Sequence, residues 1–343
     1  MSDETTRDET DGEEGSPHGT PNENSGTESP ESASADAAGV AAGSGADGRR
    51  SGFVALLGAP NAGKSTLVNR LVGTKVTIVT HKVQTTRALV RGIAMHDGAQ
   101  IVFVDTPGVF KPKRRLDRAM VKTAWSGARD ADVVLAIVDS ERGISEDVEQ
   151  ILDRLKDRPV TKALLLNKVD RIQRDKLLGL TKELTDRVAF DRVFMISALD
   201  GSGCGDLMDW LAKALPEGPW YYPEDQVSDL PLRQLAAEIT REKLYLRLHQ
   251  ELPYASHVET ELWETRPDGS VRLEQTIYVE RDSQKAIVIG HKGETIKAIG
   301  EAARKEITEA ADQKVHLFLF VKVRENWGDD PERYREMGLD YTS

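Results

Sequence analysis

The sequence predicts an α/β domain with a mostly parallel sheet, followed by a smaller α+β domain. In the first half, short apolar runs typical of buried strands alternate with helical patterns, as expected when helices cover both faces of a parallel sheet. The composition changes after Leu215, because four prolines fall within residues 216–231. The second half follows the order helix, strand, strand, helix, helix, strand. A chain of 343 residues is long enough for two separate cores.

These observations divide the chain into a disordered acidic tail at 1–50, a nucleotide-binding domain at 51–215, a linker at 216–231 and a second domain at 232–343. The linker carries the clustered aromatic residues Trp220, Tyr221 and Tyr222. Buried aromatic side chains are the commoner case, so we expect this trio to pack between the domains. Stacking on RNA bases is the alternative.

The tail holds the whole excess of negative charge. Residues 1–48 contain 12 Asp or Glu and one basic residue, Arg7, whereas the rest of the chain carries 45 acidic and 45 basic residues. The tail has no aromatic side chain and cannot bury enough apolar surface to offset the entropy of ordering, which predicts disorder. It is too acidic for a transit peptide and lacks the apolar run of a signal peptide. We interpret it as a solvated tail, with an acidic interaction arm as the alternative.

Cysteine and apolar content indicate a soluble protein of the cytoplasm. The single cysteine, Cys204, excludes an intramolecular disulfide and a cysteine-based zinc site. The seven histidines are scattered, and no pair has helical ligand spacing. No apolar run reaches the roughly 20 residues that a membrane-spanning helix requires.

The predicted strands of the first domain are 53–57, two within 90–105, 132–138, 161–166 and 193–197, with a helix at 64–71. His96-Asp97-Gly98 separates the two strands within 90–105 and is a hairpin signal. In the second domain we expect a helix at 232–251, strands at 255–265 and 271–281, two short helices flanking Gly290, and a strand at 315–323.

The first functional motif is Gly58-Ala59-Pro60-Asn61-Ala62-Gly63-Lys64-Ser65, which fits G-x-x-x-x-G-K-[ST] between a strand and a helix. Glycines let backbone N–H groups point inward, so the loop and the helix N-terminus form an anion cradle for phosphate. We expect Lys64 to hold the β- and γ-phosphates, Ser65 to ligate Mg²⁺, and Thr66 to lie beside the nucleotide. A glycine-rich turn without a ligand is the alternative, which the flanking elements disfavour.

A second motif, Asp105-Thr106-Pro107-Gly108, ends a predicted strand and is followed by Val109. Asp105 suits the strand-end carboxylate that holds Mg²⁺, and the N–H of Gly108 is free to meet the γ-phosphate. Such a turn alone is common. We therefore expect these residues to take part in nucleotide binding only together with the phosphate loop.

A third motif, Asn167-Lys168-Val169-Asp170, favours guanine over adenine. Asp170 can accept hydrogen bonds from guanine N1–H and the 2-amino group, and an unpaired buried carboxylate would reject adenine by roughly 10⁴-fold. Lys168 is expected along the base, and Asn167 is expected to tie this loop to the phosphate loop. Ser197-Ala198 ends the next strand and offers a backbone N–H to guanine O6. The motifs all end predicted strands, at the edge where open α/β sheets bind ligands.

Between these motifs, Gln84-Thr85-Thr86-Arg87 lies in a polar segment that could close on Mg²⁺ and the γ-phosphate and release after hydrolysis. The sequence does not decide between Thr85 and Thr86, and we favour Thr86. Lys64, Thr86, Asp105 and Gly108 are thus the expected catalytic set, and Ser65, Thr86 and Asp105 the expected metal ligands. An ordinary polar loop is the alternative.

Residues 52 to about 340 resemble the Era family of bacterial GTPases, through GAPNAGKS, QTTR, DTPG, NKVD and SA and then VIGHKGETIKAIG. The resemblance implies a Ras-like P-loop GTPase domain over 51–215 and a type II KH domain over 232–343. It implies GTP as substrate with Mg²⁺, the 3′ region of small-subunit rRNA and the 30S subunit as partners, and a role in 30S assembly. It also implies a monomer in the cytoplasm with peripheral contact at the cytoplasmic face of the inner membrane.

Two residues modify the expected mechanism. Ras-like switches often carry a water-orienting Gln after the D-x-x-G glycine, and Val109 stands there instead. We therefore expect slow intrinsic hydrolysis, with another group or a bound partner completing the site. Asn61 resembles the residue that helps to hold K⁺ in some related GTPases, which implies stimulation by potassium.

In the second domain, Gly290-His291-Lys292-Gly293 matches the G-x-x-G loop that clamps the backbone of about four nucleotides in KH domains. A lone G-x-x-G is weak, but the element order around it is that of a type II KH fold. The expected RNA-binding residues are Lys285, Ile289, Gly290, His291, Lys292, Gly293, Lys297, Lys322 and Arg324. For Lys322 and Arg324, which alternate near the last predicted strand, a solvated strand face is the alternative.

Three other functions are disfavoured. A nucleotide-regulated modification enzyme would need an extra catalytic domain, for which the chain has no room. A non-enzymatic RNA chaperone with a dead nucleotide site is disfavoured by the intact Lys64, Ser65 and Asp170. A membrane or cell-cycle factor lacks an anchor, although peripheral contact stays open.

Overall fold

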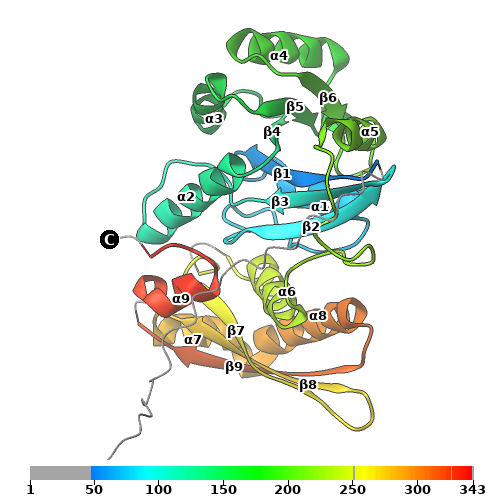
Figure 1. The fold of residues 1–343 in the computed structure, drawn as a ribbon. Coiled ribbons are helices and arrows are strands. Elements are labelled where there is room, and N and C mark those ends of the chain that lie inside the picture. Colours follow the sequence, from blue (N-terminus) through cyan, green and yellow to red (C-terminus); the bar gives the residue numbers. More distant parts are fainter. Residues whose placement is uncertain (1–47, 250–251, 326, 342–343) are drawn as a thin grey trace, which may run out of the picture. The chain divides into compact units, whose positions relative to one another are not determined.

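The computed structural model describes residues 48–249, 252–325 and 327–341, so nearly all of the expected acidic tail lies outside the described residues. The elements of the first half are β1 (Arg50–Gly58), α1 (Lys64–Val72), β2 (Val90–His96), β3 (Ala99–Asp105), α2 (Arg115–Arg129), β4 (Val133–Asp139), α3 (Glu146–Lys156), β5 (Thr161–Asn167), η1 (Val169–Arg171), α4 (Arg174–Arg187), β6 (Arg192–Ile196) and α5 (Cys204–Ala214) (Figure 1). The second half contains α6 (Leu232–Arg247), β7 (Ser256–Thr265), β8 (Val271–Val279), α7 (Asp282–Ile289), η2 (His291–Gly293), α8 (Glu294–Ala311), β9 (Val315–Val323), η3 (Trp327–Asp329) and α9 (Pro331–Glu336).

The first half forms a six-stranded sheet with the order β2-β3-β1-β4-β5-β6. Only the β2–β3 pair is antiparallel, which confirms the mostly parallel α/β sheet. Every residue of β3 and β4 is buried, because helices cover both faces. The cores place α1 and α5 on one face and α2, α3 and α4 on the other. The carboxyl ends of β1, β3, β4 and β5 therefore meet at one edge of the sheet.

Local chemistry explains the boundaries of these elements. The expected hairpin joins β2 to β3, where Asp97 (φ 46°) and Gly98 (φ 76°) take the left-handed conformations of a tight two-residue turn. Helix α3 begins after Ser145, whose Oγ accepts a hydrogen bond from the N–H of Val148, and it has acidic residues in its first turn. Strand β1 begins at Arg50, the last residue of the expected tail, because its backbone pairs with Ala99 of β3. The Arg50 guanidinium also donates to Leu215 O (2.6 Å).

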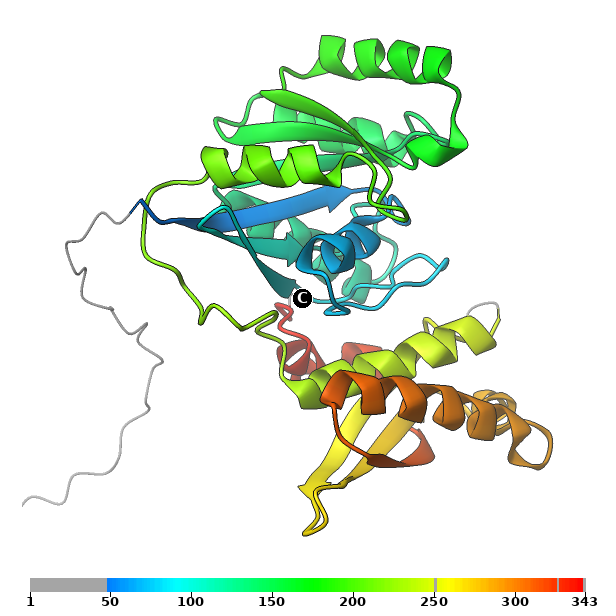
Figure 2. The same cartoon turned by 90° about the vertical axis from the view of Figure 1, so that its right-hand side faces the viewer.

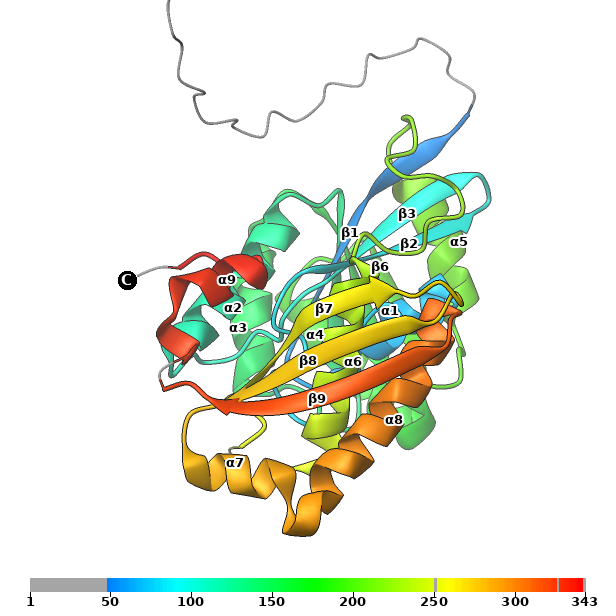
Figure 3. The same cartoon turned by 90° about the horizontal axis from the view of Figure 1, so that it is seen from below.

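The second half forms a three-stranded sheet in which β8 pairs antiparallel with β7 and parallel with β9 (Figure 3). Helices α6 and α8 pack against this sheet through Ala236, Ile239, Ala303 and Ile307. The order α6, β7, β8, α7, α8, β9 confirms the expected α+β fold.

Two expected helix lengths were wrong. The helix expected at 232–251 ends at Arg247, because Leu248 takes extended backbone (φ −92°, ψ 156°). Leu248 and Leu252 continue the apolar spacing but reach the core of this half as loop residues. Of the two short helices expected to flank Gly290, the one that follows it is α8, which has 18 residues. Its Ile299, Ala303 and Ile307 form a continuous buried stripe.

The linker aromatics were expected to pack between the domains, and that expectation was wrong. The ring of Tyr221 lies 4.9 Å from that of Phe53, and Trp220 Nε1 donates to Gly98 O (3.3 Å), so both contact the first half. The same linker pairs with edge strand β2, where Ile93 N–H donates to Val227 O (2.9 Å). Long-range contacts of this kind leave no periodic signal in the sequence. Among the described helices, none has the length and apolar character needed to span a bilayer.

Candidate nucleotide-binding site

A pocket of about 380 Å³ lies at the carboxyl edge of the six-stranded sheet. It brings together residues from the phosphate loop, the Asp105–Gly108 motif, the Asn167–Asp170 motif, Ser197-Ala198 and the Gln84–Arg87 segment. Its walls include the predicted residues Pro60, Asn61, Gly63, Lys64, Ser65, Thr66, Thr86, Gly108, Asn167, Lys168, Asp170, Ser197 and Ala198. A pocket of this size is at the small end of the range for ligand sites, and polar groups line much of it.

The phosphate loop is tied to the base-recognition loop by one amide. Asn167 Nδ2 donates to Ala62 O (2.8 Å), as predicted, and its Oδ1 accepts from the N–H of Ala198 (2.9 Å). Gly63, at φ 100°, passes so close to this amide that a Cβ would lie 2.2 Å from Asn167 Nδ2. Only glycine fits here, which fixes the loop at the start of α1.

Lys64 lies inside the loop that it is expected to serve. Its Nζ donates to Gly58 O (3.1 Å) and Ala59 O (3.2 Å), and the residue is only 6% exposed. Burial lowers the pKa of Lys64 to about 8, while the nearby Asp105 carboxylate opposes this shift. Lys64 Nζ donates only to neutral carbonyl oxygens here, and a bound phosphate group would give this buried ammonium a negatively charged partner.

Asp105 is fully buried at the end of β3 and collects hydroxyl groups. Its Oδ2 accepts from Ser65 Oγ (2.7 Å), Thr77 Oγ1 (3.0 Å) and Thr86 Oγ1 (3.2 Å). Burial raises the pKa of Asp105, and the hydrogen bond from Ser65 is the largest opposing effect. Among the described residues, Asp105 Oδ1 is a buried oxygen without a hydrogen-bond partner.

This arrangement fits a hard divalent cation. Mg²⁺ prefers oxygen ligands, and a carboxylate with two neighbouring hydroxyls offers them within one small volume. The residues Ser65, Thr86 and Asp105, predicted as metal ligands, are the ones brought together. When bound, Mg²⁺ would supply positive charge beside the phosphates.

The structure separates the two threonines that the sequence left open. Thr86 Oγ1 lies 2.9 Å from Ser65 Oγ, at the metal side of the pocket. Thr85 Oγ1 instead donates to Lys82 O (2.8 Å) and lies 2.7 Å from Thr80 Oγ1, within its own segment. The geometry favours Thr86.

At the base end, Lys168 (φ 66°) and the short helix η1 turn the chain so that Asp170 faces the pocket. Lys168 Nζ pairs with Asp139 Oδ2 (2.6 Å). The predicted N–H donors already have partners, since Ser197 N donates to Ser202 O (3.0 Å) and Ala198 N to Asn167 Oδ1. A hydrogen bond from Ala198 to guanine O6 would therefore have to replace or share the one to Asn167.

Some predicted residues support the pocket without lining it: Gly58, Ala59, Ala62, Asp105, Thr106, Pro107, Val109 and Val169. Val109 is the clearest correction, because its side chain is buried in the core beneath α2 and α3 and its N–H donates to Gly58 O (3.1 Å). Thr106 Oγ1 donates to Leu56 O (2.5 Å), so that side chain points away from the pocket.

Sequence reasoning missed several residues at this site. Asp139 ends β4 at the same sheet edge as Asp105, and its strand-end position was a signal that could have identified it. Thr77, which donates to Asp105, lies in the segment after α1 without any motif around it. The other missed wall residues are Ile78, Val79, Glu141, Arg142, Arg171 and Leu199.

The predicted G-x-x-G loop connects α7 to α8. A Cβ on Gly290 (φ 73°) would lie 2.1 Å from Thr295 Oγ1, and Gly293 (φ 82°) caps α8 in the left-handed conformation. Lys292 also has a positive φ (49°), a conformation that costs about 1 kcal/mol in a non-glycine residue. His291, Lys292 and Lys297 are exposed, whereas Lys285 and Ile289 are half-buried.

Two other predicted RNA-binding residues are already paired. Lys322, on β9, lies 3.6 Å from Glu261, and Arg324, just beyond β9, lies 2.6 Å from Asp330. These carboxylates lower the positive charge that either side chain could offer to phosphate. The solvated strand face, left open as the alternative, matches this environment better.

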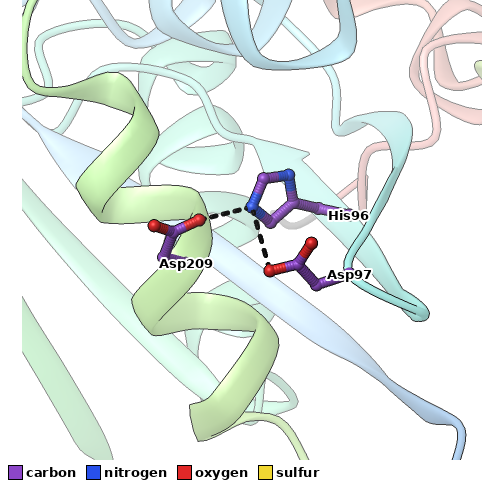
Figure 4. A group of neighbouring side chains, drawn as sticks. All are labelled: His96, Asp97 and Asp209. Atoms are coloured by element: carbon purple, nitrogen blue, oxygen red, sulfur yellow. Dashed lines mark hydrogen bonds and ion pairs between the residues drawn. The ribbon is translucent and has the colours of Figure 1, made fainter.

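One other group of potential metal ligands occurs among the described residues, away from the pocket. His96 Nε2 lies 2.6 Å from Asp209 Oδ1 and 3.9 Å from Asp97 Oδ2 (Figure 4). Asp97 and Asp209 are exposed. The contact joins the β2–β3 hairpin to α5, which accounts for the group without a metal ion.

Comparison with known proteins covers both halves of the chain. Residues 53–168 match a family model described as a 50S ribosome-binding GTPase, and residues 251–328 match the KH domain. GTPase Era of Mesorhizobium japonicum is 75% identical over 291 residues, which are 85% of this chain and 94% of that protein. GTPase Era of Rhizobium meliloti is 73% identical over 292 residues, 85% of this chain and 93% of that protein.

Two solved structures also resemble the whole described chain. One is Era in complex with MgGDPNP and nucleotides 1506–1542 of 16S ribosomal RNA, with 37% identity and a TM-score of 0.81 over 84% of this chain and 99% of that chain. The other is a variant of Aquifex aeolicus Era bound to GDP.AlF4⁻, with 37% identity and a TM-score of 0.80 over the same shares.

Proposed function

Because this chain belongs to the Era family of GTPases, we propose that it controls RNA binding by its nucleotide state during assembly of the 30S ribosomal subunit. It is a GTPase, with Mg²⁺ as the cofactor and GDP and phosphate as products. The roles assigned to its residues are those that the pocket supports. Lys64 contacts the β- and γ-phosphates, Ser65, Thr86 and Asp105 face the metal, and Asp170 reads the base.

The RNA partner follows from the second domain and from the 37% identical relative. That relative covers both halves of this chain and binds a segment of 16S RNA, which belongs to the small subunit. The model that matches residues 53–168 alone carries a 50S description, but it does not include the KH domain. The full-length likeness therefore favours the 3′ region of small-subunit rRNA, bound at the G-x-x-G loop.

The observation that carries the coupling is the position of Thr86 between two residues held by the KH domain. Thr86 lies against Ser65 and Asp105 in the pocket. Its neighbour Thr85 accepts a hydrogen bond at its carbonyl from Arg241 Nη2 of α6 (2.6 Å). Its other neighbour, Arg87, is 3% exposed and donates to Ser256 O (3.0 Å) and the Tyr245 hydroxyl (2.8 Å). A movement of Thr86 on hydrolysis would thus displace two contacts with the RNA-binding half.

A second contact involves α2, which begins seven residues after Gly108. Its Leu116, Ala119 and Met120 share a buried cluster with Trp327 and Tyr334 of the KH half. Both segments that flank the expected γ-phosphate position therefore pack against the KH half, and Figure 2 shows the chain that follows α1 lying above α6. This supports a switch that biases the arrangement of two domains.

The test measures affinity for 3′-terminal small-subunit rRNA with a GTP analogue, with GDP and without nucleotide. We expect wild type to differ between these states and Arg87→Ala to bind with nearly equal affinity in all three. Arg187→Ala, which removes surface pairs with Glu149 and Glu183 far from the KH half, is the matched control and should keep the difference. Equal affinities in wild type would remove the coupling.

Potassium is the second ion that we propose, on the basis of Asn61. This residue takes the left-handed conformation (φ 63°) at the rim of the pocket, and its Nδ2 donates to His81 O (2.9 Å) of the neighbouring segment. An ion near Asn61 would sit between the phosphate loop and that segment. Turnover should be faster in potassium than in sodium buffer, and equal rates would exclude this role.

The family resemblance further suggests a monomer in the cytoplasm that contacts the inner membrane peripherally. Sedimentation of the purified chain tests the first part of this proposal. Flotation with vesicles of the inner-membrane lipid composition tests the second, and failure to float with them would remove the membrane contact.

A further inference from the structure

A basic groove on the GTPase half is not used by the function proposed above. It has a volume of about 840 Å³ and runs beside α2 toward the residues that follow α9. Five of its lining residues are basic, namely Arg118, Lys122, Arg129, Arg154 and Arg158, and one, Asp340, is acidic. Since the chain after the tail has equal numbers of acidic and basic residues, this concentration of positive charge is a local feature. We refer to it as the α2–α3 groove.

The basic residues form an ordered stripe. Arg118, Lys122, Trp125 and Arg129 follow the spacing i, i+4, i+7, i+11, which places them along one side of α2. The buried residues of the same helix, including Met120 and Ala124, face the core and the KH half. The stripe extends for about 16 Å at the helical rise per residue. Figure 1 shows α2 and α3 side by side on this part of the molecule.

Helix α3, through Arg154, and the chain just after it, through Arg158, supply the opposite wall. Arg154 and Arg158 approach the ring of Trp125, with guanidinium carbons 5.0 and 5.9 Å from its centroid. Among the described residues, Trp125 Nε1 and Arg158 Nη1 are buried donors without a hydrogen-bond partner. Both arginines also line the groove, so their guanidinium groups provide hydrogen-bond donors at this wall.

The charge of the groove is poorly neutralised. Within the described part of the chain, Arg118, Arg154 and Arg158 have no carboxylate oxygen within 4 Å. Lys122 lies 3.0 Å from Asp340 and Arg129 lies 3.2 Å from Asp130, but both pairs are exposed and contribute little. The groove therefore presents a net positive surface with donors arranged along a line.

We propose that the α2–α3 groove binds the phosphate backbone of RNA, as a second contact site distinct from the G-x-x-G loop. This rests on the proposed function, which already brings RNA to the molecule. A single small anion would occupy only part of such a volume. A backbone offers repeated acceptors along its length, and an aromatic ring among arginines suits nucleic acid. The contact lies on α2, the helix that follows the Gly108 loop, so RNA would touch a nucleotide-sensing segment directly.

The test uses the full chain and intact small-subunit rRNA over a range of salt concentrations. Arg118→Gln combined with Arg154→Gln removes two exposed charges of the groove. Lys176→Gln combined with Lys182→Gln removes two exposed charges of α4 and is the matched control. We expect the groove variant alone to lose affinity and to lower the slope of log K against log salt by about 1.4 to 1.8, the value for two lost phosphate contacts.

A third variant, Lys292→Gln in the G-x-x-G loop, separates this proposal from the function on which it rests. If Lys292→Gln weakens binding and the groove variant does not, the groove proposal is overturned and the KH function stands. If neither variant weakens binding, both fail. If the groove variant keeps RNA affinity but loses binding to vesicles that contain anionic lipid, the groove serves a membrane surface and the RNA proposal is overturned.

Discussion

Thr86 and Thr85 are adjacent, yet their hydroxyl groups have different surroundings. Thr86 Oγ1 is one of the three hydroxyls that donate hydrogen bonds to Asp105. The Thr85 hydroxyl contacts only its own segment, and the Thr85 carbonyl accepts a hydrogen bond from Arg241. A substitution by alanine removes the hydroxyl and leaves the carbonyl. The pair therefore separates metal binding from domain contact at the scale of one residue.

We expect Thr86→Ala to lower GTP turnover by about 10- to 100-fold and to raise the Mg²⁺ concentration needed for half-maximal activity, the usual cost of disturbing a metal site. Thr85→Ala should keep both values close to wild type. The measurement is phosphate release against Mg²⁺ concentration. The reverse pattern would show that Thr85 is the residue that closes on the metal.

Lys64 gives a prediction about pH. Its pKa is lowered to about 8, first by burial, so the unliganded protein loses this charge above about pH 8. Phosphate binding stabilises the charged form, and binding above that pH therefore takes up a proton. GDP affinity should fall toward tenfold per pH unit between about pH 8 and pH 9. Calorimetry in buffers of different ionisation enthalpy measures this uptake; guanosine, which lacks phosphate, is the control and should show none.

At the site, the sequence predicted the residues that belong to contiguous motifs, because each motif carries its own chemistry. Lys64, Ser65, Asp170 and the tie made by Asn167 all lie where those motifs predict. Asp139 and Thr77 could not be ranked in the same way, because their role depends on which strands are neighbours in the sheet. The burial of Val109 likewise depends on packing against α2 and α3, which no local pattern encodes.

At the scale of elements, strands and helices were predicted well where periodicity and burial agree. The six strands of the first half were expected, because runs such as Val133 to Val138 are apolar on both faces. Helix ends were less certain, since Leu248 and Leu252 are buried without being helical. Strand β7 adds a feature that the sequence did not indicate, a buried histidine next to arginines.

His257 on β7 stacks on Trp327 with ring centroids 5.5 Å apart. Burial lowers the pKa of His257 from 6.5 to about 3. The positive charges of the nearby Arg87, Arg333, Arg241 and Arg324 contribute to the same shift. The folded protein keeps His257 neutral while the unfolded chain takes up a proton below about pH 6.5. Stability is therefore complete above that pH and falls by about 1.4 kcal/mol per unit below it.

We expect His257→Phe, which keeps an aromatic ring against Trp327, to reduce this acid sensitivity. Between about pH 7.5 and pH 5, wild type should lose about 2 kcal/mol more of its unfolding free energy than the variant does. Urea unfolding at the two pH values gives the comparison. Equal losses in both proteins would mean that His257 is not the group responsible.

At the scale of the whole molecule, a buried ion pair links the two halves. Glu242 of α6 is 3% exposed, pairs with Lys75 (2.7 Å) and accepts from the N–H of Val79 (2.8 Å), both in the segment after α1. Hydrogen bonds to a buried charge contribute about 1.5 to 3 kcal/mol each. Because unfolding of either half breaks these contacts, the unfolding free energies of the two halves are coupled.

Glu242→Ala should therefore separate the unfolding of the two halves into two calorimetric transitions, or broaden a single one. The exposed pair between Glu261 and Lys322 provides the control, since Glu261→Ala removes a contact within the KH half only. A single unchanged transition in Glu242→Ala would show that the remaining contacts, including those of Arg87 with α6 and β7 and the apolar cluster on α2, hold the halves together.

The pairing of the linker with β2 has a consequence for any reorientation of the two halves. Val227 and Ser228 continue the sheet along its edge, and Asp229 is fastened to Arg91 (2.6 Å). Peeling this stretch away would expose the unpaired backbone of an edge strand, which promotes association with other chains. The hinge is thus confined to Leu230 and Pro231, immediately before α6. A rotation at these two residues would move the RNA-binding half as a rigid body, while the edge of the six-stranded sheet stays paired with the linker.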